Sequence, residues 1–84
     1  MSQFDKLRQA LKQSRGTFAY RDFERLLAGL GYRLVTAGKT GGSRRKFMHE
    51  STKDMIWLDE PHDGEMKPAM VRRLRMHLED KGLI

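Results

Sequence analysis

Three histidines are the side chains of this sequence best suited to move protons near neutral pH, because imidazole titrates there and the chain has no cysteine. His62 stands in a polar stretch beside four acidic residues, Asp59, Glu60, Asp63 and Glu65. Such neighbours favour the protonated imidazolium and suit His62 to act as a general acid or to hold a phosphate. The alternative is a solvated loop histidine without a role. We expect His49 to be structural and His77 to face solvent or an interface.

A run of cations offers a complementary chemistry, which is anion binding. Arg44, Arg45 and Lys46 follow the glycine-rich bend Gly41-Gly42-Ser43, and Lys39 comes just before that bend. Side chains alternate between the two faces of a strand, so at least one face here must be wet and positive. A second group of cations lies around the start and the outer face of the last predicted helix: Lys67, Arg72, Arg73 and Arg75. Together the two groups indicate one continuous footprint for an anion, although arginines on a helix are also ordinary surface residues.

The overall charge agrees with anion binding. The 84 residues carry a formal net charge of +6, and the sequence pI is about 10.1. Such a surface attracts polyanions, of which nucleic acid is the usual one, but solubility or an acidic protein partner would account for the same charge. Residues 59–66 contain carboxylates and an imidazole that could bind a divalent cation, yet their spacing matches no calcium loop. We therefore expect no metal and no cofactor.

Three helices are predicted as part of the scaffold for these residues. An apolar repeat at i, i+3 and i+7 predicts a first helix over about residues 2–14. A fuller apolar stripe predicts a second helix over residues 20–30, with Gly31 as its C-terminal cap. The last helix is expected to begin at Lys67-Pro68, where proline suits the first turn, and to end at Gly82.

Between the second and the last helix the hydrophobic period changes to alternation, which predicts strands over residues 32–37, 44–49 and 55–58. Their short turns give an antiparallel meander, and no crossover helix is available for a parallel sheet. Residues 17–19 are expected to be a short connection. Residues 59–66 are expected to lack regular structure because of Pro61 and Gly64. Trp57, the only tryptophan, is expected to be packed or covered by a partner, with stacking on a base as the alternative.

The predicted order, ααβββα, is an α+β fold in a single domain over residues 1–84, with helices covering one face of a three-stranded antiparallel sheet. It is the arrangement of a double-stranded-RNA-binding-like fold, in which basic side chains follow phosphates and 2′-hydroxyls. The N-terminus lacks the apolar core of a signal peptide, and no run of residues approaches transmembrane length. The sequence therefore predicts a cytoplasmic protein without membrane contact.

Five segments also carry a resemblance to a known family: Leu26-Leu27 through Leu30-Gly31-Tyr32, the Gly42-Ser43 start of a basic strand ending at Phe47, the Pro61-His62 loop, Glu65-Met66-Lys67-Pro68, and Leu78 to Gly82-Leu83. They resemble the HicA family of bacterial toxins over about residues 17–84. The combination of the Gly-Ser strand start with the Glu-Met-Lys-Pro helix start is the most specific part. The additional helix over about residues 2–14 resembles a longer subgroup of the same family.

The resemblance implies an endoribonuclease that cleaves messenger RNA and is held inactive by a HicB-type antitoxin. In the commonest form of the family a catalytic histidine follows Gly-Ser at the start of the second strand, where this sequence has Arg44. Arginine stays protonated and cannot serve as a general base, but it can neutralise charge on a phosphate in the transition state. His62 occupies a position where the family often carries histidine, so we expect His62 to transfer protons and Arg44 to stabilise phosphate charge. The residues expected to bind RNA are Lys39, Ser43, Arg44, Arg45, Lys46, Lys67, Arg72 and Arg73.

Several alternatives remain open from the sequence. The RNA 2′-hydroxyl is the expected nucleophile, and water is the alternative. A non-catalytic RNA- or DNA-binding module is a second hypothesis, which the arginine at the strand start supports. An interaction module whose basic face binds an acidic protein is a third.

Overall fold

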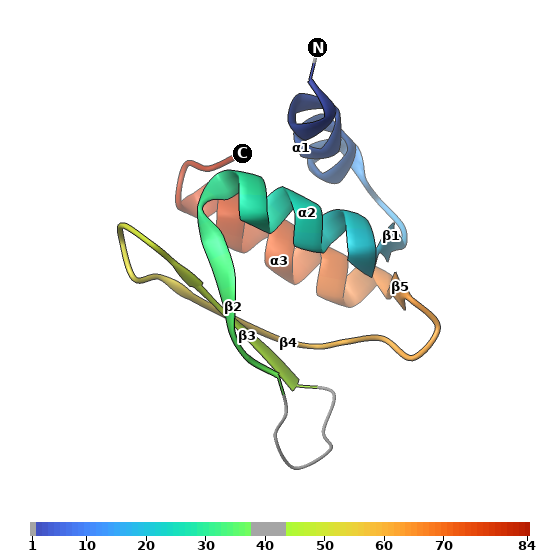
Figure 1. The fold of residues 1–84 in the computed structure, drawn as a ribbon. Helices are drawn as coiled ribbons and strands as arrows, with labels where there is room; N and C mark the ends of the chain where they lie inside the picture. Colours follow the sequence, from blue (N-terminus) through green and yellow to red (C-terminus); the bar gives the residue numbers. More distant parts are fainter. Residues whose placement is uncertain (1, 38–43) are drawn as a thin grey trace.

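The computed structural model describes residues 2–37 and 44–84, which form three helices and five strands (Figure 1). The helices are α1 (Gln3–Gln13), α2 (Tyr20–Leu30) and α3 (Pro68–Asp80). The strands are β1 (Phe18–Ala19), β2 (Tyr32–Ala37), β3 (Arg44–His49), β4 (Met55–Asp59) and β5 (Glu65–Met66). Two residues predicted to bind RNA, Lys39 and Ser43, lie outside the described residues.

The predicted antiparallel sheet is present, with the strand order β2-β3-β4. In the β3–β4 pair, Lys46 lies opposite Trp57 and Arg44 lies opposite Asp59. Helices α2 and α3 both lie on one side of this sheet (Figure 1). Within the described residues, no helix covers its other side. The α+β class and the one-sided helical cover predicted from the sequence are therefore confirmed.

The structure adds two short strands that the predicted order lacks. β1 and β5 pair antiparallel, with Phe18 opposite Met66 and Ala19 opposite Glu65. The prediction that residues 17–19 are only a connection is wrong, because Phe18–Ala19 form β1. The prediction that residues 59–66 lack regular structure is also wrong at the end of this stretch, because Glu65–Met66 form β5. Both Phe18 and Met66 are buried, so the core brings together two segments that are distant in sequence. A strand of two residues has no alternation from which it could be predicted.

Local chemistry explains where the helices begin and end. Ser2 caps α1, because its hydroxyl accepts the backbone N–H of Asp5 at 3.1 Å. α2 ends at Gly31, whose φ of 104° lies in the left-handed region that glycine adopts readily. Pro68 begins α3, where the first turn needs no backbone N–H from it. All three helices agree with the prediction to within one or two residues.

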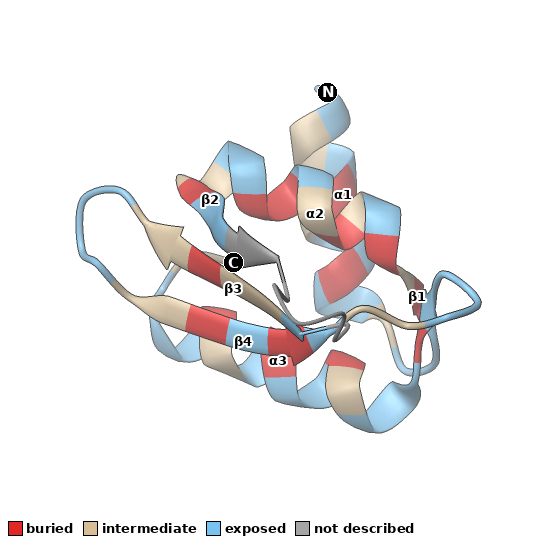
Figure 2. Ribbon diagram, turned by 60° about the horizontal axis from the view of Figure 1, so that its bottom comes forward, coloured by how far each residue is buried: buried red, intermediate tan, exposed pale blue. Residues whose placement is uncertain are grey.

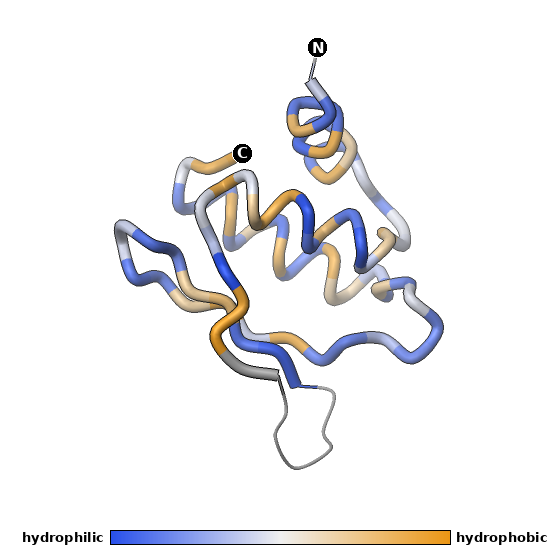
Figure 3. Tube along the Cα trace, viewed as in Figure 1, coloured by the Kyte–Doolittle hydropathy of each residue, from blue (hydrophilic) through white to orange (hydrophobic). Residues whose placement is uncertain are grey.

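A single hydrophobic core joins the sheet to the helices, and each of the eight described elements contributes at least one buried residue to it. Along β4, buried Ile56 and Leu58 alternate with exposed Trp57 (Figure 2). Apolar positions recur along α2 and α3, as expected for helices that are buried on one face (Figure 3). The core thus determines which face of the sheet stays open.

α1 is held to the rest of the domain mainly through α2. Leu7 and Leu11 are buried in this contact, and Leu11 is completely inaccessible. Phe4 lies so close to Gly29 that a Cβ at Gly29 would meet the ring at 2.3 Å. Glycine inside a helix is unfavourable by itself. The close approach of Phe4 explains why glycine nevertheless occupies position 29.

Candidate functional site

An open groove of about 500 Å³ lies between the end of β4 and the start of α3. Its lining residues are Asp59, Glu60, Pro61, His62, Asp63, Met66, Lys67 and Met70. His62 is exposed, whereas Met66 is fully buried and paired with β1. The β1–β5 pair therefore anchors one end of the segment that carries His62. The groove has the volume of an ordinary ligand site, and it contains the histidine that the sequence singled out.

Acidic residues of this segment neutralise cations of the predicted footprint. Three ion pairs join them: Arg44 Nε to Asp59 Oδ1 at 3.1 Å, Arg45 Nη2 to Glu60 Oε1 at 2.8 Å, and Lys67 Nζ to Asp63 Oδ2 at 3.4 Å. The backbone N–H of Glu65 and, after it, the charge of Lys67 lower the pKa of Asp63. The Arg44–Asp59 and Lys67–Asp63 pairs are exposed and contribute little to stability, so a phosphate can replace either carboxylate at modest cost, whereas Arg45 is only 21% exposed. The start of β3 is thereby held beside the groove that contains His62.

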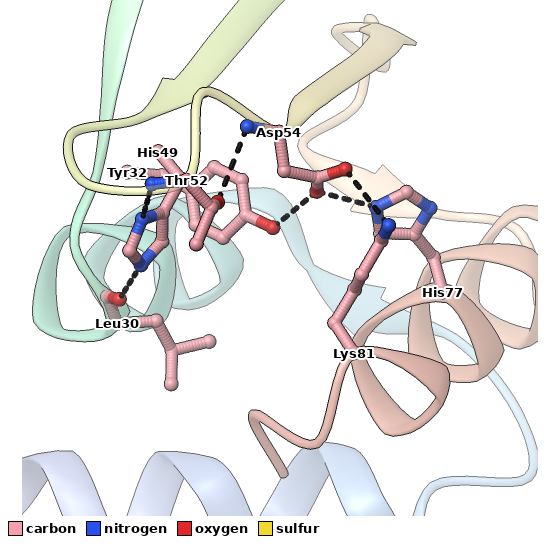
Figure 4. Close-up of polar contacts among 7 residues, drawn as sticks. All are labelled: Leu30, Tyr32, His49, Thr52, Asp54, His77 and Lys81. Atoms are coloured by element: carbon pink, nitrogen blue, oxygen red, sulfur yellow. Dashed lines mark hydrogen bonds and ion pairs between the residues drawn. The ribbon is translucent and has the colours of Figure 1, made fainter.

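His49 is structural, as predicted. Its Nε2 lies 2.9 Å from the backbone carbonyl of Leu30, and its Nδ1 accepts the backbone N–H groups of Ser51 and Thr52 at 3.2 Å (Figure 4). Because Nδ1 accepts, the ring proton must lie on Nε2, which donates to Leu30. The ring also packs edge-on against Tyr32, with centroids 5.0 Å apart. Both nitrogens are engaged, which leaves neither for substrate.

His77 is more constrained than predicted. Its Nε2 lies 2.7 Å from Oδ2 of Asp54, and only about a third of its side chain is exposed (Figure 4). Asp54 also accepts the hydroxyl of Tyr32 at 2.5 Å and pairs with Lys81 Nζ at 3.5 Å. Three donors, one from β2, one from α3 and one from the residue that follows α3, therefore converge on one carboxylate just before β4. The sequence gives no sign of this cluster, because its members are far apart in the chain and share no motif.

The electrostatics of Asp54 follow from these partners. Burial of the carboxyl opposes its ionisation, but the hydrogen bonds from His77 and Tyr32 and the charges of His77 and Lys81 outweigh burial and lower its pKa. Burial and the same hydrogen bond raise the pKa of Tyr32. A hollow of about 310 Å³ adjoins the cluster. Since the carboxylate is already surrounded by donors, the arrangement suits a structural connection between the sheet and α3.

The prediction that Trp57 is packed is wrong, whereas its cover by a partner stays a prediction. Its exposed fraction is 44%, so within the described residues it is neither packed in the core nor covered. Lys46 Nζ lies 4.6 Å and Arg44 Cζ 5.9 Å from the centroid of its ring. The face of β3 that carries Arg44 and Lys46 is therefore the open face of the sheet, which agrees with the prediction that at least one face of this strand is wet and positive. An aromatic ring lies among the cations of this face.

The arginines of α3 point to different parts of the surface. Arg73 Nη2 donates to the backbone carbonyl of Trp57 at 3.2 Å, which connects α3 to β4. Arg72 instead lines a separate hollow of about 240 Å³ with Arg15 and Arg75. Arg75 donates from Nη1 to the backbone carbonyl of Ser14 at 2.6 Å. The second predicted group of cations is thus divided between three places in the structure, since Lys67 lines the groove that contains His62.

Two negative findings apply to residues 2–37 and 44–84. No group of three or more His, Cys, Asp or Glu side chains in this part of the chain is placed to hold a metal ion. None of the helices described there combines the length and the apolar character needed to cross a membrane.

The fold and the site define a class of protein, a small α+β domain of the double-stranded-RNA-binding-like type with a basic strand beside a histidine-containing groove. Residues 20–83 match the family model described as the HicA toxin of bacterial toxin-antitoxin. The chain therefore belongs to the HicA toxin family. No curated protein and no solved structure matches the chain.

Proposed function

We propose that this HicA toxin is a metal-independent endoribonuclease that cleaves messenger RNA in the cytoplasm and is neutralised by a HicB-type antitoxin. Membership of a toxin family supports the toxin role. The basic strand and the groove beside it support RNA as the substrate, because phosphates bind to clustered cations.

The observation that carries the proposal is the state of the three histidines. His49 uses both ring nitrogens within the fold, and His77 is bound to Asp54. His62 is exposed in the groove, and no hydrogen bond to its ring occurs within the described residues. Its nitrogens are therefore open to substrate, which a proton-transfer group requires.

The proposed reaction is attack of an RNA 2′-hydroxyl on the adjacent phosphorus. The bond from oxygen to phosphorus forms as the bond to the 5′-oxygen breaks, and protonated His62 gives its proton to that leaving oxygen. The 2′-hydroxyl proton passes to solvent or to a base. Arg44 neutralises charge on the phosphate after leaving Asp59, and it takes no part in proton transfer. Attack by water remains the alternative route.

The proposed RNA footprint contains the cations and the serine predicted from the sequence: Lys39, Ser43, Arg44, Arg45, Lys46, Lys67, Arg72 and Arg73. Arg44, Arg45 and Lys67 support it best, because their carboxylate partners line the groove that contains His62. Arg72 lies in a different hollow and would contact RNA only beyond the groove.

Induction of the chain in bacteria tests the proposal. Wild-type protein should arrest growth and fragment messenger RNA, and His62→Ala at equal expression should do neither. Glu65→Gln is the matched control in the same segment, since Glu65 is exposed and has no proposed role. Normal growth with intact RNA, produced by a folded wild-type chain, would refute the ribonuclease proposal.

Purified protein separates the two chemical routes. An RNA with a single 2′-deoxy nucleotide at the cleavage site cannot undergo internal attack. Loss of cleavage at that site alone supports the 2′-hydroxyl as nucleophile, whereas continued cleavage identifies water.

A non-catalytic RNA- or DNA-binding module is the second candidate, and the arginine at the start of β3 favours it. Salt-dependent binding without strand scission would identify that function. Tight binding to an acidic protein without affinity for nucleic acid would instead identify an interaction module.

A further inference from the structure

The open face of the sheet carries a large aromatic side chain that the core does not explain. Trp57 is 44% exposed, whereas its neighbours Ile56 and Leu58 on β4 are 2% and 3% exposed. Strand alternation directs Trp57 away from α2 and α3. No element within the described residues covers it.

Cations surround this ring. Lys46 is its direct cross-strand partner, with Nζ 4.6 Å from the ring centroid, and Arg44 lies diagonally across the β3–β4 pair at 5.9 Å. The acidic neighbour on the same face, Asp59, already pairs with Arg44 at 3.1 Å. The ring therefore presents a flat π surface in a positive environment.

This combination fits a nucleobase and its phosphates. A base stacks on an aromatic side chain whatever its identity, while cations beside the ring bind the backbone. The base must come from a single strand, because bases within a duplex are not accessible for stacking. Tryptophan and arginine are enriched at protein interfaces, but lysine is depleted there, and Lys46 is the cation nearer to the ring, so a protein partner fits this arrangement less well.

Arg44 connects this ring to the groove that contains His62. It lies near Trp57 on one side and pairs with Asp59, a lining residue of that groove, on the other. We propose that Trp57 is a stacking platform for one base of single-stranded RNA, and that Lys46 and Arg44 bind the phosphates between this base and the groove. The inference rests on the proposed function, which supplies RNA as the ligand, and adds a base-binding site on the sheet.

The single tryptophan makes the test direct, because all tryptophan fluorescence comes from Trp57. The probe is a 2′-O-methyl single-stranded oligonucleotide of about ten nucleotides, which blocks internal attack and carries a terminal dye for anisotropy. Its integrity is checked on a gel. An oligonucleotide of the same length with abasic sugars keeps the phosphates and removes the bases. The variants are Trp57→Ala, Trp57→Phe and, as a control, Met76→Ala, which removes another exposed apolar side chain from α3.

The base-containing probe should quench Trp57 fluorescence, and the abasic probe should not. Trp57→Ala should weaken binding by roughly 5- to 150-fold, as expected for the loss of one stacked base. Trp57→Phe should retain most of the affinity, and Met76→Ala should bind like wild type.

Two results would overturn the inference in different ways. If the probe binds by anisotropy while the Trp57 fluorescence of the wild-type protein stays unchanged and Trp57→Ala keeps the wild-type affinity, the platform is refuted and RNA binding by the protein stands. If no probe binds even at low salt, the proposed function fails together with the platform. A fluorescence change caused only by an acidic protein would assign Trp57 to a protein interface and refute the RNA site.

Discussion

Asp54 is a residue on which side chains from separate parts of the fold converge. It accepts from Tyr32 and His77 and pairs with Lys81, so one side chain connects β2, the start of β4 and α3. Its side chain is only 15% exposed. A charged group in that position is stable only with such partners, and its removal leaves the hydroxyl of Tyr32 without an acceptor.

Asp54→Asn should lower the free energy of unfolding at pH 7 by about 1.5–3 kcal/mol, because hydrogen bonds to an ionised carboxylate are replaced by bonds to an amide. Since folding lowers the pKa of Asp54, its ionised form stabilises the protein above its ordinary pKa of 3.8, and that stabilisation is lost as the pH falls through the lower folded-state value. The difference between wild type and variant should therefore shrink below about pH 4. Urea unfolding followed by circular dichroism from pH 7 to pH 3 measures it.

Exposed Asp80 provides the control, and Asp80→Asn should change stability little at either pH. A constant difference between wild type and Asp54→Asn across this range would show that the ionised carboxylate is not the source of the stability.

Gly31 is restricted twice, by its backbone and by its neighbour. Its φ of 104° is unfavourable for residues with a Cβ, and a Cβ there would lie 2.8 Å from Nε2 of His49. Gly31→Ala should therefore destabilise the fold by about 1–3 kcal/mol and weaken the hydrogen bond from His49 to Leu30. Exposed Gly16 has open space around it, so Gly16→Ala should be close to neutral. Equal midpoint temperatures of thermal unfolding for the two variants would contradict the claim that position 31 is restricted to glycine.

The histidines show how far single residues can be understood from sequence. The structural role of His49 could be predicted, because strand alternation directs its side chain toward the helices. The contact between His77 and Asp54 could not, since it depends on how α3 sits against the turn before β4. His62 was selected by its acidic neighbours, and its catalytic role stays a prediction.

At the scale of elements, α1 stands apart because the family match begins at residue 20. Its attachment nevertheless buries Leu11 completely. Leu11→Ala should lower the free energy of unfolding by roughly 2–5 kcal/mol, a large part of the stability of a small domain. Chemical denaturation measures this free energy. The control is Lys12→Ala, which changes the exposed residue next to Leu11. If Leu11→Ala unfolds like wild type, α1 is an appendage that does not support the core.

The three helices and the three-stranded sheet could be predicted because each has its own hydrophobic periodicity, and residues such as Ser2, Gly31 and Pro68 mark helix ends. β1 and β5 could not, because their pairing depends on the burial of Phe18 and Met66 in a core built by other elements. The prediction that Trp57 is packed failed for a different reason. Composition makes burial of a tryptophan the usual outcome, but its place in the alternation of β4 directs it outward.

At the scale of the whole molecule, the net charge of +6 does not describe where the cations and carboxylates lie relative to one another. The carboxylates of Asp59, Glu60 and Asp63 engage three of the cations proposed to bind RNA. Part of the positive surface is therefore neutralised where it would meet the substrate.

The combined variant Asp59→Asn, Glu60→Gln and Asp63→Asn should bind non-cleavable RNA more tightly than wild type. The dependence of log affinity on log salt should steepen by about 0.7 for each additional phosphate contacted. Fluorescence anisotropy over a range of salt concentrations measures both effects. The fold should persist, because the Arg44–Asp59 and Lys67–Asp63 pairs are exposed and contribute little to stability, and Glu60 itself is 41% exposed.

A charge-matched control removes acidic residues elsewhere: Asp22→Asn, Glu79→Gln and Asp80→Asn. It should leave the salt dependence nearer to that of wild type, because long-range effects of exposed charges are screened. If both triple variants gain affinity equally, net charge alone governs binding and the ion pairs at the groove have no special effect.

The contact between Arg73 and Trp57 bears on self-association. β4 is an edge strand of its sheet, and unpaired carbonyls along such an edge invite strands from other molecules. The guanidinium of Arg73 donates a hydrogen bond to the backbone carbonyl of Trp57, a residue in the middle of β4. A second chain could not extend the sheet there without first displacing a side chain of α3. The helix that supports the core thus also opposes edge-to-edge pairing along β4.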